Sequence, residues 1–392
     1  MPSEVLSNWK AGLQKGIGAL ERRNQHRSLA EIRGVNFCSN DYLGLARHPA
    51  LREAVSMAVQ QAEQVGGTGS RLLSGQTEDW HEVENRFATF AGTEAALFFT
   101  TGYAANLGLI SALVNKDDVI FSDALNHASL IDGMRLSGAR KIIYPHLNLR
   151  ILEDALRQEA GAPWRKVIVT ESVFSMDGDI APLSAIAALA EKYGAALIVD
   201  EAHATAVHGP GGRGIAAQAD IVAHLLAVVH TCGKALGCAG AFVCGPVVLK
   251  EHLVNHARTF IFSTALPPYF CKQIAAALDL SARMDVERQK LLQNAARFAH
   301  QLRAEGFDTA ASASQIVPIV LGNNEDTLDA AEHLQREGFA VRAIRPPTVP
   351  QGGSRLRLSL TALIPEQELT RLVNSLVAWR SRQQISVASK HA

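Results

Sequence analysis

The chain has no excess of charge of either sign and no long apolar run. Its 392 residues include 38 Lys plus Arg and 38 Asp plus Glu, so no global electrostatic field gathers nucleic acid or an anionic membrane. No window reaches transmembrane length, and residues 1–10 lack the basic stretch and apolar run of a secretory signal. We therefore expect a soluble, cytoplasmic protein that binds neither nucleic acid nor membrane.

Cysteine is scarce, and its spacing argues against a metal centre. The chain has five cysteines, an odd number with no CxxC pair. None has a second cysteine or a histidine at the short spacing of a zinc knuckle. Most lie inside apolar runs, which is typical of reduced, buried thiols. We therefore expect no metal at Cys38, Cys232, Cys238, Cys244 or Cys271.

Short apolar runs alternate with amphipathic helical stretches from about Thr77 to Gly245, without internal repeats. Continuous apolar runs bounded by helices indicate a mainly parallel sheet that is covered on both faces. The predicted fold class is therefore α/β, with a seven-stranded sheet whose ligands bind beyond the carboxyl ends of the strands. The predicted strands are 95–100, 119–122, 141–144, 167–170, 196–199, 226–230 and 241–244.

The two ends of the chain differ from this centre. A helix is expected over 8–23, and the glycine-rich segment 66–75 interrupts all periodicity. Beyond about Leu266 the pattern predicts an α+β unit with a long helical region, strands near 315–321, 341 and 355–360, helices over 326–337 and 365–380, and a frayed tail from 382. The predicted organisation is an N-terminal helix and arm (1–48), a large α/β domain (49–265) and a small α+β domain (266–392).

A lysine flanked by glycines follows one predicted strand. Lys234 lies in Thr231-Cys-Gly-Lys-Ala-Leu-Gly237, and residues 225–244 contain almost no other charge. A solvated surface lysine is the ordinary alternative. A desolvated lysine has a lowered pKa and can form a Schiff base with a carbonyl group. The isolation of Lys234 favours this second interpretation.

Polar residues also follow other predicted strands. Asp200 ends the run 196–199, and a carboxylate at the end of a buried strand needs a cation, for example a protonated ring nitrogen with His203 beside it. A helix cap is the plainer alternative for Asp200. Gly102 and Tyr103 open a helix whose free N–H groups can bind an anion. The hydroxyl of Thr231 suits a phosphate oxygen.

Six short motifs occur in order along nearly the whole chain: Ser39-Asn-Asp-Tyr-Leu-Gly-Leu45, Gly67-Thr-Gly-Ser-Arg-Leu72, Asn126-His-Ala-Ser129, Glu171-Ser-Val-Phe-Ser-Met-Asp-Gly-Asp179, Val199-Asp-Glu-Ala-His203 and Thr231-Cys-Gly-Lys234. Together they resemble the α-oxoamine synthases, a family of fold-type-I enzymes. The resemblance implies that the cofactor is pyridoxal 5′-phosphate. It also implies a homodimer whose subunits share their active sites.

The resemblance gives a role to each matching residue. Lys234 is implied to carry the cofactor, and Asp200 to pair with its ring nitrogen. His127 is implied to stack on the ring, with His203 near the phenolic oxygen. The other cofactor contacts are expected from Gly102, Tyr103, Ser175, Thr231 and, on the neighbouring subunit, Thr264. The expected substrate contacts are Arg22, Asn40, Glu171, Arg345, Thr348 and Arg357.

Three details of this resemblance stay open at the level of sequence. Arg23 is an alternative to Arg22 for the acyl substrate. Arg355 is an alternative to Arg357 as the anchor of the amino-acid carboxylate, because side chains two residues apart on a strand share a face. Ala206 stands where the family pattern leads us to expect glycine, a departure that concerns loop packing more than chemistry.

The C-terminal segments 343–350 and 354–361 narrow the expected substrates. They resemble the members of the family that condense L-alanine with pimeloyl-CoA, or with a pimeloyl carrier protein, in biotin biosynthesis. The implied product is 8-amino-7-oxononanoate, with release of CoA and CO2. The nearest alternative is a sibling that uses glycine, of the 5-aminolevulinate synthase or 2-amino-3-ketobutyrate CoA ligase type. Two further alternatives are an aminotransferase and a non-catalytic protein that kept the fold.

Overall fold

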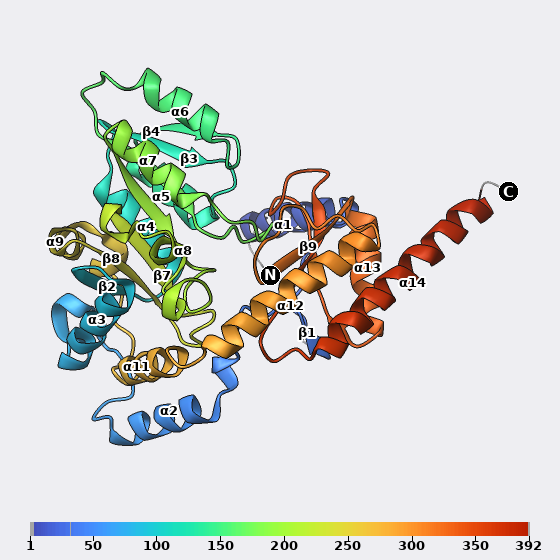
Figure 1. The fold of residues 1–392 in the computed structure, drawn as a ribbon, viewed down its shortest axis with the longest axis horizontal. Coiled ribbons are helices and arrows are strands. Elements are labelled where there is room, and N and C mark those ends of the chain that lie inside the picture. The colour runs from blue at the N-terminus through green and yellow to red at the C-terminus, as the bar shows by residue number, and fades with distance from the viewer. Residues whose placement is uncertain (1–3, 32, 391–392) are drawn as a thin grey trace.

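A seven-stranded sheet organises the larger of two lobes in the computed structural model (Figure 1). The structure describes residues 4–31 and 33–390, with side chains through residue 383. Strand β8 is antiparallel to both its neighbours, and the other pairings are parallel. The predicted α/β class with a mainly parallel sheet is therefore confirmed. Across the sheet the strands are β2 (Ala95–Phe99), β8 (Ala241–Gly245), β7 (Ala227–Thr231), β6 (Ala195–Asp200), β5 (Lys166–Glu171), β3 (Val119–Asp123) and β4 (Arg140–Tyr144).

Helices cover both faces of this sheet, which is why its strands are continuous apolar runs in the sequence. Each strand begins and ends within one residue of its predicted position. One face packs against α4 (Gly102–Leu113), α5 (Ala128–Ser137) and α9 (Val247–His256). The other face packs against α3 (Glu78–Ala91), α6 (Leu149–Gln158) and α7 (Leu183–Lys192).

The smaller lobe is built on a three-stranded antiparallel sheet in the order β11-β12-β9. The chain reaches it through α11 (Tyr269–Ser281) and α12 (Asp285–Ala304), and α12 runs from one lobe to the other (Figure 1). This arrangement confirms the smaller C-terminal α+β unit. Its elements are β9 (Ile316–Gly322), α13 (Asn324–Arg336), β10 (Phe339–Ala340), β11 (Ala343–Ile344), β12 (Ser354–Ser359) and α14 (Glu366–Lys390).

The N-terminal arm packs on this smaller lobe. Strand β1 (Val35–Asn36) pairs in parallel with β10, and the ring of Phe37 lies edge-on to that of Phe339 with centroids 6.0 Å apart. The arm therefore shares a core with residues beyond 266, and the three domain boundaries given above stay a prediction. The remaining α-helices are α1 (Glu4–Arg22), α2 (Pro49–Gln61), α8 (Ile215–Gln218) and α10 (Arg258–Ile261).

Two local expectations need correction. The predicted frayed tail from 382 is wrong, because α14 continues to Lys390; this stretch contains neither proline nor glycine, so nothing in its sequence ends the helix. The single strand expected near Val341 is replaced by two strands of two residues each, β10 before that residue and β11 after it. The family pattern led us to expect glycine at position 206, where the chain has alanine. The φ of Ala206 is 65°, in the left-handed region that favours glycine, which accounts for the family's preference.

All five cysteines are free thiols, and Cys232, Cys244 and Cys271 are buried. Burial raises the pKa of each of these three thiols, which keeps them protonated and unreactive. Among the residues that the structure describes, no helix is both long enough and apolar enough to cross a bilayer.

Candidate active site

A cavity of about 210 Å³ lies where several strands of the large sheet end. Glu171, Asp200 and Thr231 are the last residues of β5, β6 and β7. These strands are parallel, so their carboxyl ends lie on the same side of the sheet and the three side chains lie close together. The cavity brings together eight of the residues singled out in the sequence: Gly102, Tyr103, His127, Glu171, Asp200, His203, Thr231 and Lys234.

A chain of hydrogen bonds runs through the base of the cavity. Nζ of Lys234 lies 2.8 Å from Nε2 of His203, and Nδ1 of His203 lies 2.6 Å from the hydroxyl of Tyr42. That hydroxyl donates to Oδ1 of Asn40 at 3.1 Å. All three bonds are satisfied when His203 carries its proton on Nδ1: Lys234 donates to Nε2, and Nδ1–H donates to Tyr42.

The same surroundings favour the neutral forms of both basic groups. Desolvation lowers the pKa of Lys234 to about 8, against opposing attraction from Asp200 and Glu171. Burial, and then the charge of Lys234, lower the pKa of His203 well below its usual value. The lowered lysine pKa agrees with the expectation of a desolvated amine. A substantial neutral fraction near physiological pH suits a nucleophile and proton acceptor.

Asp200 is held by two donors rather than by a neighbouring cation. Its Oδ2 accepts from Nδ2 of Asn106 at 2.7 Å, and its Oδ1 accepts from the backbone N–H of Ala202 at 2.8 Å. The second bond is the helix-cap type of contact that was the plainer alternative, but the carboxylate also lines the cavity. It is 5% exposed, so a cation in the cavity is its natural counter-charge.

His127 and Glu171 form one wall. The backbone N–H of His127 donates to Oε1 of Glu171 at 2.6 Å, and the His127 ring caps α5 by accepting from Ser129 N–H. Burial lowers the pKa of His127. Burial, followed by the charge of Asp200, raises the pKa of Glu171 well above its usual value. Both shifts favour the neutral forms of these two side chains.

The start of helix α4, which lines the cavity, is suited to a phosphate. Helix α4 starts at Gly102, and the hydroxyl of its cap residue Thr101 accepts from Ala104 N–H. Gly102 and Tyr103 line the cavity, and their N–H groups, at the first positions of the helix, have no partner within it. A Cβ on Gly102 would lie 3.6 Å from the Thr231 hydroxyl, space that the glycine leaves open. These groups fit pyridoxal phosphate: N–H groups and a hydroxyl for the phosphate, a carboxylate for the ring nitrogen and an amine for the aldehyde.

Arg355 and Arg357 differ in their partners although they lie on the same strand, β12. Arg355 forms a largely buried ion pair with Asp177. Arg357 donates to neutral oxygens, among them the Ser175 carbonyl, Asn40 Oδ1 at 3.1 Å and Ser359 Oγ at 2.7 Å. Among the described residues, no carboxylate pairs with Arg357. Its charge is therefore available to a ligand, and it acts on the pKa values of Lys234 and His203.

Other predicted site residues lie outside this cavity. Ser175 contributes its carbonyl to Arg357 instead of a hydroxyl to the cavity. Arg345 donates to the carbonyls of Asn24 and His26, and lines a separate groove of about 860 Å³ between the N-terminal arm and the smaller lobe. Thr348 accepts from Arg27 at 3.0 Å. Arg22 ends α1 with an exposed side chain.

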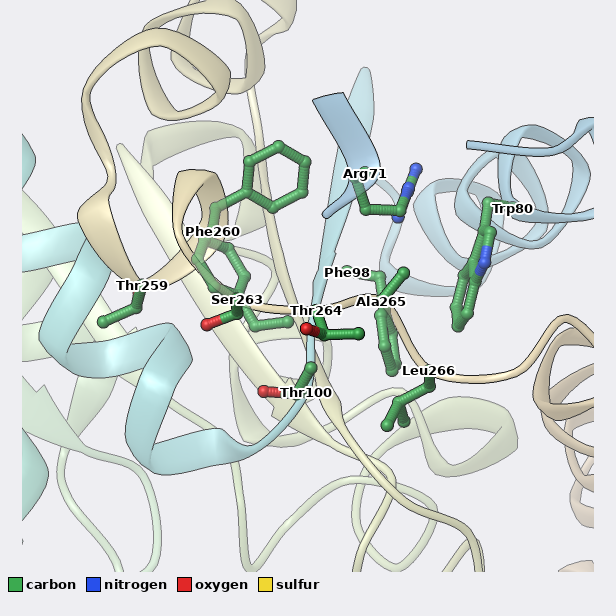
Figure 2. A pocket seen from close by; sticks show the side chains of 11 residues that line it. Arg71, Trp80, Phe98, Thr100, Thr259, Phe260, Ser263, Thr264, Ala265 and Leu266 are labelled. Carbon is green, nitrogen blue, oxygen red and sulfur yellow. The ribbon is translucent and has the colours of Figure 1, made fainter. Parts of the chain in front are cut away.

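Thr264 belongs to another small cavity, drawn in Figure 2 with Ser263, Thr100 and Arg71 around it. This cavity has about 10 Å³, room for roughly one water molecule. The backbone of Thr264 forms an isolated bridge with Ser70. Within its own chain Thr264 is thus separate from Lys234, and its expected contact with a neighbouring subunit's cofactor stays a prediction.

Several residues in or beside these sites were not predicted as site residues from the sequence. Asn106 and Ser129 line the cavity, and Asn106 also donates to Ser129 Oγ at 2.9 Å. Tyr42 links His203 to Asn40, and Arg27 joins the groove beside Arg345. Asn106 is close in sequence to Tyr103, and Tyr42 to Asn40. Their hydrogen bonds to Asp200 and His203, which are far away in the sequence, show that they belong to the site.

Comparisons with known proteins agree with this geometry. Residues 32–376 match the family Aminotransferase class I and II. The 8-amino-7-oxononanoate synthase of Geobacter sulfurreducens is 48% identical over 368 residues, covering 93% of this chain and 94% of that protein. The enzyme of the same name from Marinobacter nauticus is 41% identical over 391 residues, covering 99% and 98%. The chain belongs to the 8-amino-7-oxononanoate synthase family.

Solved structures place this family member among pyridoxal-phosphate enzymes of fold type I. Serine palmitoyltransferase from Sphingomonas wittichii superposes with a TM-score of 0.89 at 29% identity, covering 98% of this chain and all of that one. A serine palmitoyltransferase solved with its PLP gives a TM-score of 0.87 at 29% identity over 96% and 98%. The 8-amino-7-oxononanoate synthase of Francisella tularensis gives 0.78 at 30% over 90% and 99%. The chain is thus a transferase whose cofactor is pyridoxal phosphate.

Proposed function

We propose that this enzyme condenses L-alanine with pimeloyl-CoA, or a pimeloyl carrier-protein thioester, to give 8-amino-7-oxononanoate and CO2 in biotin biosynthesis. The observation that carries the proposal is the match of enzymes named for this product over 90% or more of the chain. The cavity supports it, since it holds an amine and a buried carboxylate. The Arg357 guanidinium on β12 pairs with no carboxylate among the described residues, and its charge acts on the pKa of Lys234.

Lys234 and Asp200 have complementary tasks in this proposal. Bound pyridoxal phosphate supplies a cationic ring that accepts electron density from the amino-acid Cα. Asp200 keeps the proton on the ring nitrogen, because its buried charge needs a cation and its two donors fix its direction. Lys234 first holds the cofactor aldehyde and then takes the proton from Cα, for which a pKa of about 8 is suitable.

The remaining cavity residues bind and orient. We assign the ring face to His127 and the phenolic oxygen to His203, whose proton on Nδ1 is held by Tyr42. The N–H groups of Gly102 and Tyr103, with the Thr231 hydroxyl, bind the phosphate. Burial and the charge of Asp200 raise the pKa of Glu171, which favours the form of its carboxyl that adds no charge beside Asp200. The carbonyl of Ser175 and the amide of Asn40 aim Arg357.

Arg357 is proposed to hold the alanine carboxylate. Replacing it with lysine keeps the charge but removes the planar fork of donors, so we expect KM for alanine to rise by about 10- to 100-fold. Steady-state kinetics with varied alanine at saturating thioester measures this change. The matched control is Arg355→Lys, two residues away on β12, whose partner is Asp177. An equal rise of KM in both variants would refute the choice of Arg357.

The groove beside the N-terminal arm is proposed to receive the acyl substrate. It carries Arg27, Arg342 and Arg345 near Thr348, and burial lowers the pKa of Arg345 with help from the charge of Arg27. Clustered guanidinium groups favour anionic ligands such as a carboxylate or a phosphate. We keep Arg22 as a proposed contact at the end of α1, although its exposed side chain is not part of the groove lining.

We also propose a cytoplasmic homodimer that shares its active sites. The apolar side chains of Val5, Trp9 and Leu13 on α1 are 67%, 70% and 64% exposed in the single chain, which supports burial against another subunit. In this dimer Thr264 reaches the neighbouring phosphate. Sedimentation at twice the chain mass of 42.1 kDa would support the dimer, and sedimentation as a monomer at micromolar concentration would contradict it.

The product identifies the reaction. We expect the purified holoenzyme, given alanine and pimeloyl-CoA, to release CoA and a product with the mass of 8-amino-7-oxononanoate. Glycine or serine in place of alanine, and succinyl-, acetyl- or palmitoyl-CoA in place of pimeloyl-CoA, serve as matched comparisons. A higher kcat/KM with glycine or serine would overturn the assignment in favour of a sibling synthase. Accumulation of pyridoxamine phosphate during turnover would instead indicate an aminotransferase.

A further inference from the structure

We propose that His146 is a positioning residue, a charged imidazolium that ties the turn carrying His127 to the turn carrying Ser175. The inference rests on the proposed roles of His127 and Arg357, and it adds a residue that contacts neither cofactor nor substrate. His146 follows β4, the edge strand of the large sheet, and its side chain is 23% exposed.

Both nitrogens of the His146 ring meet a carboxylate. Nδ1 lies 2.8 Å from Oδ1 of Asp123, and Nε2 lies 2.6 Å from Oδ2 of Asp179. The Phe174 ring lies edge-on to the imidazole with centroids 4.4 Å apart. A neutral imidazole has one N–H and can donate to only one of these carboxylates, whereas an imidazolium donates to both. The geometry therefore calls for the charged form.

Asp123 connects this ring to His127. It is the last residue of β3, and its carboxylate accepts from the N–H groups of Leu125 at 2.8 Å and Leu147 at 2.9 Å. The Leu125 contact shapes the turn that leads to His127 at the start of α5. Because Asp123 is 2% exposed, its charge needs a buried partner, and the His146 ring supplies one.

Asp179 connects the ring to the other turn. The backbone carbonyl of Asp179 accepts from Phe174 N–H at 3.1 Å, which closes the loop 174–179. This loop presents the Ser175 carbonyl to Arg357 and the Asp177 carboxylate to Arg355. Oδ1 of Asp179 is buried without a hydrogen-bond partner. The hydrogen bond from His146 therefore offsets the cost of burying the negative charge of Asp179.

The electrostatics agree with the geometry. Burial opposes protonation of His146, but its hydrogen bonds to Asp123 and Asp179 outweigh it and raise the pKa of the ring to about 10. Two other titratable groups lie near, Tyr144 on β4 and Glu171 on β5. The charge of Asp123 contributes to the raised pKa of each, so both favour their neutral forms. The positive ring therefore faces two carboxylates and no competing cation among these groups.

The sign of the pH effect follows from the raised pKa. The unfolded chain has the ordinary histidine pKa of about 6.5, so the bridge stabilises the fold fully below that pH. The stabilisation is lost progressively as the pH rises from about 6.5 through about 10. The ring keeps both protons in the folded protein until the pH approaches about 10, where the bridge itself is lost.

The test uses the chain without and with its cofactor. In the cofactor-free protein, NMR of labelled histidine should give His146 a pKa at least about 2 units above the ordinary value, and Asp179→Asn should lower it. A titration near the ordinary value would overturn the proposal whatever the reaction proves to be. This measurement needs no substitution at His146, so it does not depend on the folding of a variant.

A variant separates positioning from stability. We expect His146→Gln to lower Tm at neutral pH but much less above pH 10, and to lower kcat of the holoenzyme by about 10-fold through misplacement of the two turns. His300→Gln, at an exposed position of α12, is the matched control. A Tm difference that is the same at both pH values, or an unchanged kcat with normal KM for alanine, would contradict the positioning role without touching the proposed reaction.

Discussion

Lys234→Ala is expected to lower kcat by about 10⁴-fold or more, because it removes both the attachment point of the cofactor and the amine that accepts the Cα proton. The variant should also lose the visible absorbance of the lysine-linked cofactor. The fold should survive, since the Lys234 side chain lines a cavity and its amine hydrogen-bonds His203 rather than a carboxylate. Stopped assays of CoA release and absorption spectra of the reconstituted protein measure the two effects.

The design of this experiment includes a control and a rescue. Lys192 pairs with Glu153 on the surface and is 59% exposed, so Lys192→Ala should keep full turnover and the normal spectrum. Small primary amines added to Lys234→Ala should restore part of the rate, because they can fill the cavity left by the side chain. Full turnover of Lys234→Ala without added amine would refute the central assignment.

Asp200→Asn is expected to lower kcat by about 10²- to 10³-fold, since a neutral amide does not hold a proton on the ring nitrogen. The substitution also disturbs local hydrogen bonding. Asn106 and Ala202 both donate to Asp200, so an amide N–H at position 200 faces a donor from one of them. Steady-state kinetics and circular dichroism of the bound cofactor report the two consequences.

A double variant distinguishes charge from hydrogen bonding. Asp200→Asn combined with Asn106→Asp restores a hydrogen bond between an amide and a carboxylate at these two positions. The carboxylate, however, then lies at position 106 instead of position 200. If the charge at position 200 is what matters, the double variant should stay as slow as Asp200→Asn. Recovery to near the wild-type rate would show that hydrogen bonding alone limited the single variant, and would contradict the proposed role of Asp200.

The large sheet could be predicted almost to the residue because most of its strands are buried on both faces; the edge strand β4 is the exception. A run such as Val228 and Val229 needs no distant partner to be recognised, since burial makes it apolar throughout. The smaller lobe was predicted less well where its strands are only two residues long. Strand β10 depends on β1, which lies at the other end of the sequence, and β11 depends on β12, from which the segment 345–353 separates it.

The candidate site divides in the same way. Lys234 and Asp200 stand out because each is a charge beside an apolar strand end, a local signal. The choice of Arg357 over Arg355 had no local signal, because the two residues share a strand face. The structure favours Arg357 because Arg355 forms an ion pair with Asp177, a residue of the larger lobe. Tyr42 and His146 were likewise hidden, as their partners lie 161 and 33 residues away at the farthest.

The sequence by itself determined the α/β class, the strand positions and the isolated lysine and aspartate, because periodicity, burial and local charge are written in neighbouring residues. Tertiary structure alone decided which groups meet: the chain from Lys234 through His203 to Tyr42, the unpaired charge of Arg357 and the clamp on His146. Each depends on contacts between segments far apart in the chain. Such contacts are fixed by the packing of the whole molecule, and no local pattern encodes them.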